Sequence, residues 1–179
     1  MLLAPGSPKL NRHIMVENNI VDFVMFNPLE MIRVPFTIPW DTFYDRRFLW
    51  EYMFRSAFFG EWIFENLLLL GQTTIAVALL GIIPLFAGAR RRWGQWDLTR
   101  PMLLLGAALL LTLATFRALH PCTCDQDFRY IPLIAVSAVA LAFQGFTQWG
   151  ATGTRLLMLW SLLLAALQSA FLVSFYWMS

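Results

Sequence analysis

The feature of this sequence that most constrains its fold is a set of four long stretches without a charged side chain, at residues 66–89, 101–116, 130–154 and 156–179. An α-helix rises 1.5 Å per residue, so about 20 residues cross the roughly 30 Å hydrocarbon core of a bilayer. In lipid the backbone must satisfy its own hydrogen bonds, which favours helices in stretches of this length. The sequence therefore predicts an all-α integral membrane protein.

After an N-terminal region of residues 1–62, we expect four transmembrane helices, at residues 63–88, 101–119, 130–148 and 156–177. The second is long enough only if Arg117 extends its side chain to the membrane surface, and Pro84 should kink the end of the first. Only 13% of the residues are charged, against about 25% in soluble domains, and the net charge is +2. Soluble enzymes and nucleic-acid-binding proteins are therefore excluded.

The distribution of arginine predicts how the chain is oriented. The loop from Arg90 to Arg100 holds four arginines and one aspartate, whereas the loops near residues 120–129 and 148–155 hold one arginine each. Arginine-rich loops remain on the cytoplasmic side of a membrane. We therefore expect the Arg90–Arg100 loop to be cytoplasmic, and both chain ends and the 120–129 loop to face outward.

Residues 14–62 are amphipathic and too often interrupted by charges and prolines to span a membrane. From Asp41 the pattern turns helical, and Arg47, Glu51 and Arg55 share one face of that helix. Two interpretations stay open, a helix that lies in the membrane interface and a helix that packs on a partner protein. Either needs an apolar neighbour, and the candidate contact residues are large aromatic side chains and their neighbours: Trp40, Phe48, Trp50, Tyr52, Phe58, Phe59 and Trp62.

The two cysteines, Cys122 and Cys124, lie in one short loop. A metal site needs three or four ligands, which His120 and Asp125 could complete, and a disulfide between such close cysteines is geometrically tight. We expect unreactive thiols and no metal. His120 could instead be an axial ligand of haem or a pigment, but we predict no cofactor because no second histidine lies near a predicted span.

Arg129 lies at the predicted membrane surface, next to Tyr130 and near His120. A planar guanidinium group suits bidentate binding of a phosphate. The alternative is an arginine that reaches the interface and pairs with Asp125 or Asp127. Arg129, Tyr130 and His120 are therefore a candidate site for a lipid phosphate or head group, and we expect bound lipids.

Several short motifs in a fixed order resemble the late part of bacterial polytopic glycosyltransferases of the GT-C group, such as protein mannosyltransferases and aminoarabinose transferases. The resemblance covers most of the chain, about residues 18–148. It is carried by Phe26-Asn27-Pro28, Pro35-Phe36-Thr37-Ile38-Pro39-Trp40-Asp41, Phe48-Leu49-Trp50-Glu51-Tyr52, Ser56-Ala57-Phe58-Phe59-Gly60-Glu61, His120-Pro121 and Asp127-Phe128-Arg129-Tyr130-Ile131.

The resemblance implies a place in the bacterial inner membrane, because such enzymes take a sugar from a polyprenyl-phosphate donor at its outer face. It also implies that the N-terminal region is external and that Arg129 faces a lipid phosphate. The family has more spans and a catalytic aspartate in its first external loop, and this chain has no counterpart of that half.

We therefore expect a non-catalytic membrane subunit that is a scaffold within a larger complex of integral membrane subunits. The alternative is the split half of a working glycosyltransferase. A channel or transporter is disfavoured, because no acidic or basic residue lies in the middle of a predicted span.

Overall fold

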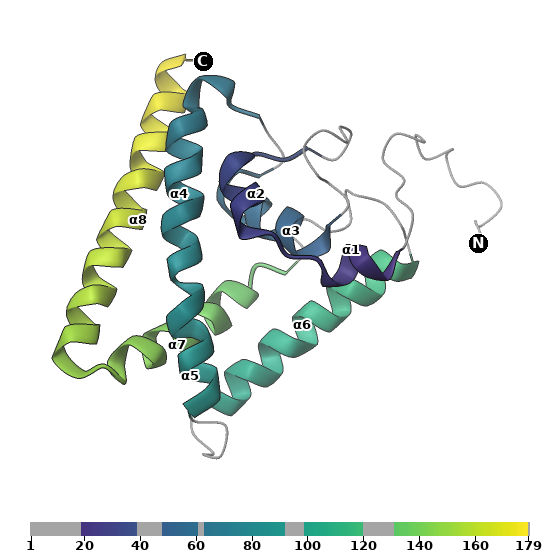
Figure 1. Ribbon diagram of the computed structural model, residues 1–179, viewed down its shortest axis with the longest axis vertical. Coiled ribbons are helices and arrows are strands. Elements are labelled where there is room, and N and C mark those ends of the chain that lie inside the picture. The colour runs from purple at the N-terminus through teal and green to yellow at the C-terminus, as the bar shows by residue number, and fades with distance from the viewer. Residues whose placement is uncertain (1–18, 39–47, 61–62, 92–98, 120–130, 179) are drawn as a thin grey trace.

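The computed structural model describes residues 19–38, 48–60, 63–91, 99–119 and 131–178. These residues form helices and no strands, which confirms the all-α class (Figure 1). The elements in chain order are α1 (Ile20–Val24), α2 (Pro28–Arg33), α3 (Leu49–Phe59), the 3₁₀ turn η3 (Glu65–Leu67), α4 (Leu68–Leu80), α5 (Ile82–Arg91), α6 (Thr99–Leu119), α7 (Ile134–Thr147) and α8 (Gly150–Met178).

Three described helical stretches, Glu65–Ala87, Arg100–Leu119 and Gly150–Trp177, are long and apolar enough to cross a membrane. They match three of the four expected spans. The fourth is present as α7 but has only 14 residues, about 21 Å of helix, which is shorter than the hydrocarbon core. It is short because residues 131–133 form a turn around Pro132, and a second turn at residues 148 and 149 precedes α8.

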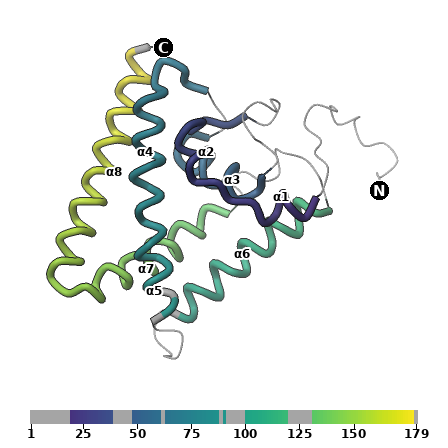
Figure 2. The backbone as a smooth tube through the Cα atoms, in the orientation of Figure 1, coloured from purple at the N-terminus to yellow at the C-terminus, as the bar shows by residue number. Residues whose placement is uncertain are grey.

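The helices of the apolar part alternate in direction. In Figure 1, α4 and α5 run downward, α6 rises, α7 descends and α8 rises beside α4. The end of α5, the start of α6 and the turn between α7 and α8 therefore lie at one end of the molecule. The start of α4 and the end of α8 lie at the other, as the tube in Figure 2 also shows.

Helix α8 contacts the other described helices through a narrow seam. Its less exposed residues include a series spaced four and three apart: Gly153, Leu157, Trp160, Leu164, Leu167, Phe171 and Ser174. This average spacing of 3.5 residues is typical of two helices that wind around each other. The opposite face of α8 is apolar and exposed, and only 6% of the Gly150–Trp177 span is buried within the chain.

The described N-terminal helices fill the angle between α4 and α6 (Figure 1). Phe36 lies at the centre of their contact with α8, because its ring centroid is 5.0 Å from that of Phe59 and 6.4 Å from that of Phe171. A second cluster joins Leu49 of α3 to Leu113 of α6 and to Ile131. Phe36, Leu49 and Phe59 therefore anchor the described part of residues 19–60 on the chain's own apolar helices.

Helix α3 starts later than the pattern predicts. Phe48 has extended backbone angles (φ −81°, ψ 113°) and precedes the first helical residue, Leu49. A helix that runs unbroken from Asp41 is therefore excluded, although residues 39–47 lie outside the described residues. Gly60, with φ of 64°, ends α3 in a conformation that favours glycine.

The first span is interrupted at Gly81, three residues before the proline expected to kink it. Pro84 has no N–H to donate to the carbonyl of Leu80, and the N–H of Gly81 bonds to the carbonyl of Ala78 at 3.0 Å. In an unbroken α-helix the Gly81 N–H would bond to the Val77 carbonyl instead. That carbonyl has therefore lost its usual donor. Trp160 of α8 replaces it, because its indole Nε1–H donates to that carbonyl at 2.8 Å.

Replacing Trp160 with phenylalanine tests this contact. The substitution keeps an aromatic ring and removes the N–H, so a carbonyl inside the apolar helices loses its donor. We expect a loss of about 1–2 kcal/mol of stability, measured as a lower thermal unfolding midpoint in mild detergent. Trp177→Phe is the matched control, because Trp177 is exposed. Equal midpoints for the two variants would contradict a stabilising role of the Trp160 hydrogen bond.

Candidate functional site

The polar residues of α3 point into the protein. Glu51 and Arg55 lie one helical turn apart, and each is only 1% exposed. A buried charged group is costly unless it is hydrogen-bonded or paired. The partners of these two side chains therefore indicate what they do.

Glu51 binds the start of α2. Its Oε1 accepts the backbone N–H of Asn27 at 2.6 Å. Asn27 is in turn the N-terminal cap of α2, since its Oδ1 accepts the N–H of Glu30 at 3.2 Å. The carboxylate therefore fixes the residue from which α2 begins.

Arg55 binds the backbone that leaves α2. Its Nη1 donates to the carbonyl of Val34 at 3.0 Å and to that of Phe36 at 3.5 Å, and its Nε donates to the carbonyl of Glu51 at 3.3 Å. Residues 34–38 are neither helix nor strand. The guanidinium group thus supplies donors that regular secondary structure would otherwise supply.

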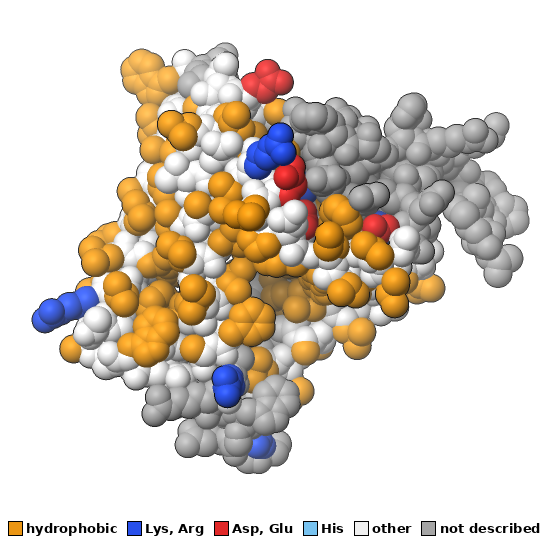
Figure 3. Space-filling model, in the orientation of Figure 1, with side chains coloured by type: hydrophobic (Ala, Val, Ile, Leu, Met, Phe, Trp, Pro, Cys, Tyr) orange, Lys and Arg blue, Asp and Glu red, His pale blue; other side chains and the backbone are white. Residues whose placement is uncertain are grey.

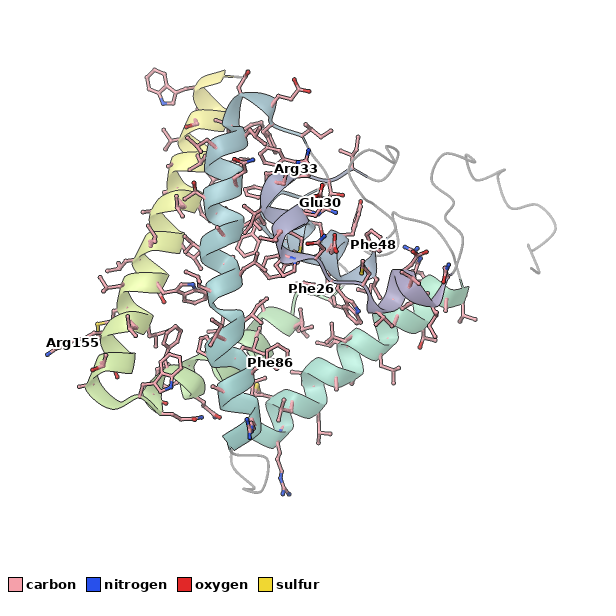
Figure 4. All side chains as sticks on the ribbon, in the orientation of Figure 1. Phe26, Glu30, Arg33, Phe48, Phe86 and Arg155 are labelled. Atoms are coloured by element: carbon pink, nitrogen blue, oxygen red, sulfur yellow. The ribbon has the colours of Figure 1, made fainter. Side chains whose placement is uncertain are left out.

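Two further side chains bind the same stretch of backbone. Trp50 Nε1 donates to the carbonyl of Phe23 at 2.6 Å, and Gln72 Nε2 of α4 donates to the carbonyl of Arg33 at 3.2 Å. We call Trp50, Glu51, Arg55 and Gln72 the backbone clamp. Together they hold atoms of residues 23–36 in place, and Figure 4 shows Glu30 and Arg33 on the outer side of this region.

Arg117, in the last turn of α6, is buried next to the clamp. It was expected to extend to the membrane surface, but it is only 1% exposed. Its guanidinium carbon lies 5.9 Å from the centre of the Phe23 ring, within the range of a cation–π contact. The expectation of a surface position was wrong because sequence alone did not reveal that α1 covers the end of α6.

The candidate contact residues that the structure describes are buried to different degrees. Phe48, Tyr52 and Phe59 are buried, whereas Trp50 and Phe58 are half-buried. The apolar neighbours of Phe59 include Ile75 of α4 and Phe171 of α8, so the chain's own helices supply them for this residue. Trp40 and Trp62 lie outside the described residues.

The candidate lipid-phosphate residues His120, Arg129 and Tyr130 also lie outside the described residues, as do Cys122, Cys124 and Asp125. Within the described part, no three side chains of His, Cys, Asp or Glu gather in a group that could hold a metal ion. The candidate site that the structure does describe is the backbone clamp.

The sequence interpretation placed Glu51 and Arg55 on one face of a helix but did not predict that this face is buried. It missed Gln72 completely. A signal was present, because Gln72 is a polar residue inside an otherwise apolar stretch, and such residues in membrane helices hydrogen-bond to neighbouring segments. Its partner, 39 residues earlier in the chain, could not be identified from spacing.

Comparison with known protein families, characterised proteins and solved structures finds no match to the chain. The resemblance to GT-C glycosyltransferases therefore stays a prediction from the quoted motifs.

Proposed function

We propose that this chain is a non-catalytic membrane subunit that acts as a structural component of a larger membrane complex. The observation that carries the proposal is how its buried charges are used. Glu51 and Arg55 bind backbone groups of residues 27–36 and of α3 itself. Charged side chains that are committed to holding a fold favour a structural role.

The apolar outer faces of the long helices support an assembly. Only 11% of the Arg100–Leu119 span and 6% of the Gly150–Trp177 span are buried within the chain. These faces must contact lipid or other membrane helices. An exposed apolar face of α7, which includes Val136, Val139 and Phe143, offers a further contact surface to a partner helix.

We further propose that α7 completes a set of four membrane-embedded helices and that the arginine-bearing end is cytoplasmic. Arg90 near the end of α5 and Arg100 near the start of α6 flank one loop, and Arg155 near the start of α8 follows another. Those helix ends lie at the same end of the molecule (Figures 1 and 4). This grouping supports the orientation inferred from the loops, with both chain ends on the periplasmic side of a bacterial inner membrane.

The proposed contact with a lipid phosphate remains assigned to His120, Arg129 and Tyr130. Support comes from the motifs that contain them and from their place after α6, whose last described turn lies beside Phe23 of α1. A bound lipid at this position would be compatible with a structural subunit and with a transferase alike.

Purification from native membranes in mild detergent tests the proposal. A tagged chain is expected to recover other integral membrane subunits at constant stoichiometry, and an unrelated tagged membrane protein of similar size is the control. Recovery of the chain alone would overturn the scaffold function. Turnover of a polyprenyl-linked sugar that is abolished by Arg129→Ala would instead support the alternative, a split glycosyltransferase.

A further inference from the structure

The short helix α1 has its apolar and polar sides reversed relative to a helix in water. Asp22 points inward and is 7% exposed, whereas Ile20 and Val24 are 78% and 71% exposed. Helices on a water-facing surface bury their apolar side chains and expose their charges. The environment outside α1 is therefore apolar.

The exposed apolar surface continues from α1 into α2. Met25, Phe26 and Leu29 are also exposed, and Leu29 is 78% exposed. We call Ile20, Val24, Met25, Phe26 and Leu29 the N-terminal apolar patch. Contiguous apolar surface of this kind marks a contact with lipid or protein. Beyond the patch lie Glu30 and Arg33, which we call the polar rim (Figure 4). Glu30 Oε2 and Arg33 Nη1 are 3.9 Å apart.

The position of α1 along the apolar helices favours lipid as the neighbour of this patch. The Phe23 ring contacts Arg117 in the last turn of α6, and Phe23 packs against the cluster that contains Leu113. Helix α1 is thus fixed at the end of a candidate membrane span. On that span Phe116 and Leu119 are exposed next to this end.

The N-terminal apolar patch is therefore continuous with the exposed apolar surface of α6. Figure 3 shows apolar side chains of α1 and of the adjoining end of α6 side by side on one face of the molecule. A surface that continues the outer face of a span shares the apolar surroundings of that span, in which lipid fills every place that no partner helix covers.

We propose that the N-terminal apolar patch inserts into the membrane and seats α1 and the start of α2 among the lipids around the end of α6. Glu30 and Arg33 then lie at the level of the head groups. There the charged ends of their side chains reach water while the methylene groups contact the apolar layer. This inference rests on the membrane assignment in the proposed function. It moves the lipid contact from the segment after Asp41 to residues 20–29, because the described part of α3 faces the chain's own helices.

Site-directed spin labelling measures this contact directly. In a chain with Cys122→Ser and Cys124→Ser, single nitroxide labels are placed by Val24→Cys, Leu29→Cys and, as the matched control on the polar rim, Arg33→Cys. The labelled proteins are reconstituted in phosphatidylglycerol and phosphatidylcholine vesicles. Collision with oxygen, which concentrates in lipid, is compared with collision with a neutral nickel chelate, which remains in water. The ratio of oxygen to nickel accessibility is expected to be several-fold higher at positions 24 and 29 than at 33.

Two results would overturn the inference. Nickel accessibility at positions 24 and 29 equal to that at 33 would place the patch in water. Low accessibility to both reagents would mean that protein covers it. An unchanged thermal midpoint confirms that the labelled chains are folded. The outcome is separate from the proposed scaffold function, which fails only if no other subunit is recovered with the chain.

Discussion

Arg55→Ala is expected to lower the stability of the protein by about 2–4 kcal/mol. The substitution leaves the carbonyls of Val34 and Phe36 without the donor that Arg55 provides, and an unsatisfied buried polar group costs about 1–3 kcal/mol. A loss of this size corresponds to a fall of about 10 °C in the thermal midpoint of a chain of this length. The stability of Arg55→Lys should lie between that of Arg55→Ala and that of the unchanged protein, because an ammonium group cannot reproduce the several donors of a guanidinium group.

Hydrogen exchange locates the effect. Without Arg55, the backbone amides of residues 19–38 should exchange faster, whereas those of α8 outside its contact with Phe36 should not. Arg33→Ala is the matched control, because the Arg33 side chain is 79% exposed and its partner Glu30 is 3.9 Å away, an arrangement that contributes little. If Arg55→Ala were as stable as Arg33→Ala, the backbone clamp would not hold the N-terminal helices.

The helices of the apolar part could be predicted because one physical requirement dominates there. Without charges, residues 66–89, 101–116 and 156–179 had to bury their backbone polar groups in helices, and the structure has helices in the described parts of all three. The shorter α7 was not predicted. Its apolar stretch is long enough, but the turn at Pro132 and the turn before Gly150 shorten the helix from both ends.

The clamp could be predicted only in part, because its contacts join residues far apart in the sequence. Periodicity placed Glu51 and Arg55 on the same face of a helix. It could not reveal that this face meets the backbone of residues 27–36, which is 19–24 residues away. The usual assumption that a charged face meets water fails here, because this face is covered by the backbone of residues 27–36.

The break in the first span shows the same limit on a smaller scale. Pro84 correctly predicted a disturbance, since proline removes a donor wherever it occurs. The break lies at Gly81, where the Trp160 indole occupies the space that a side chain on residue 81 would need. Trp160, which donates to the Val77 carbonyl, is 83 residues away in the sequence. The local sequence around Gly81 therefore does not reveal this contact.

Gly145→Ala is expected to have the largest effect of any substitution considered for this chain. Helices α5 and α7 approach so closely that a Cβ on residue 145 would overlap the backbone carbonyl of Pro84. Backbone atoms cannot rotate away as a flexible side chain can, so the two helices must separate. Overpacking of a well-packed interface costs about 1–3 kcal/mol and sometimes more, and we expect a loss of about 3 kcal/mol or failure to fold.

Gly106→Ala is the matched control, because both glycines lie in contacts between apolar helices but differ in the space around them. A Cβ on residue 106 would lie 3.4 Å from the Cβ of Ser137, an ordinary van der Waals distance. Alanine is also a better helix former than glycine, so this variant should be as stable as the unchanged protein. The measurements are the yield of monodisperse protein in mild detergent and its thermal midpoint. Equal results for the two variants would mean that the backbones of α5 and α7 do not approach each other closely at Gly145.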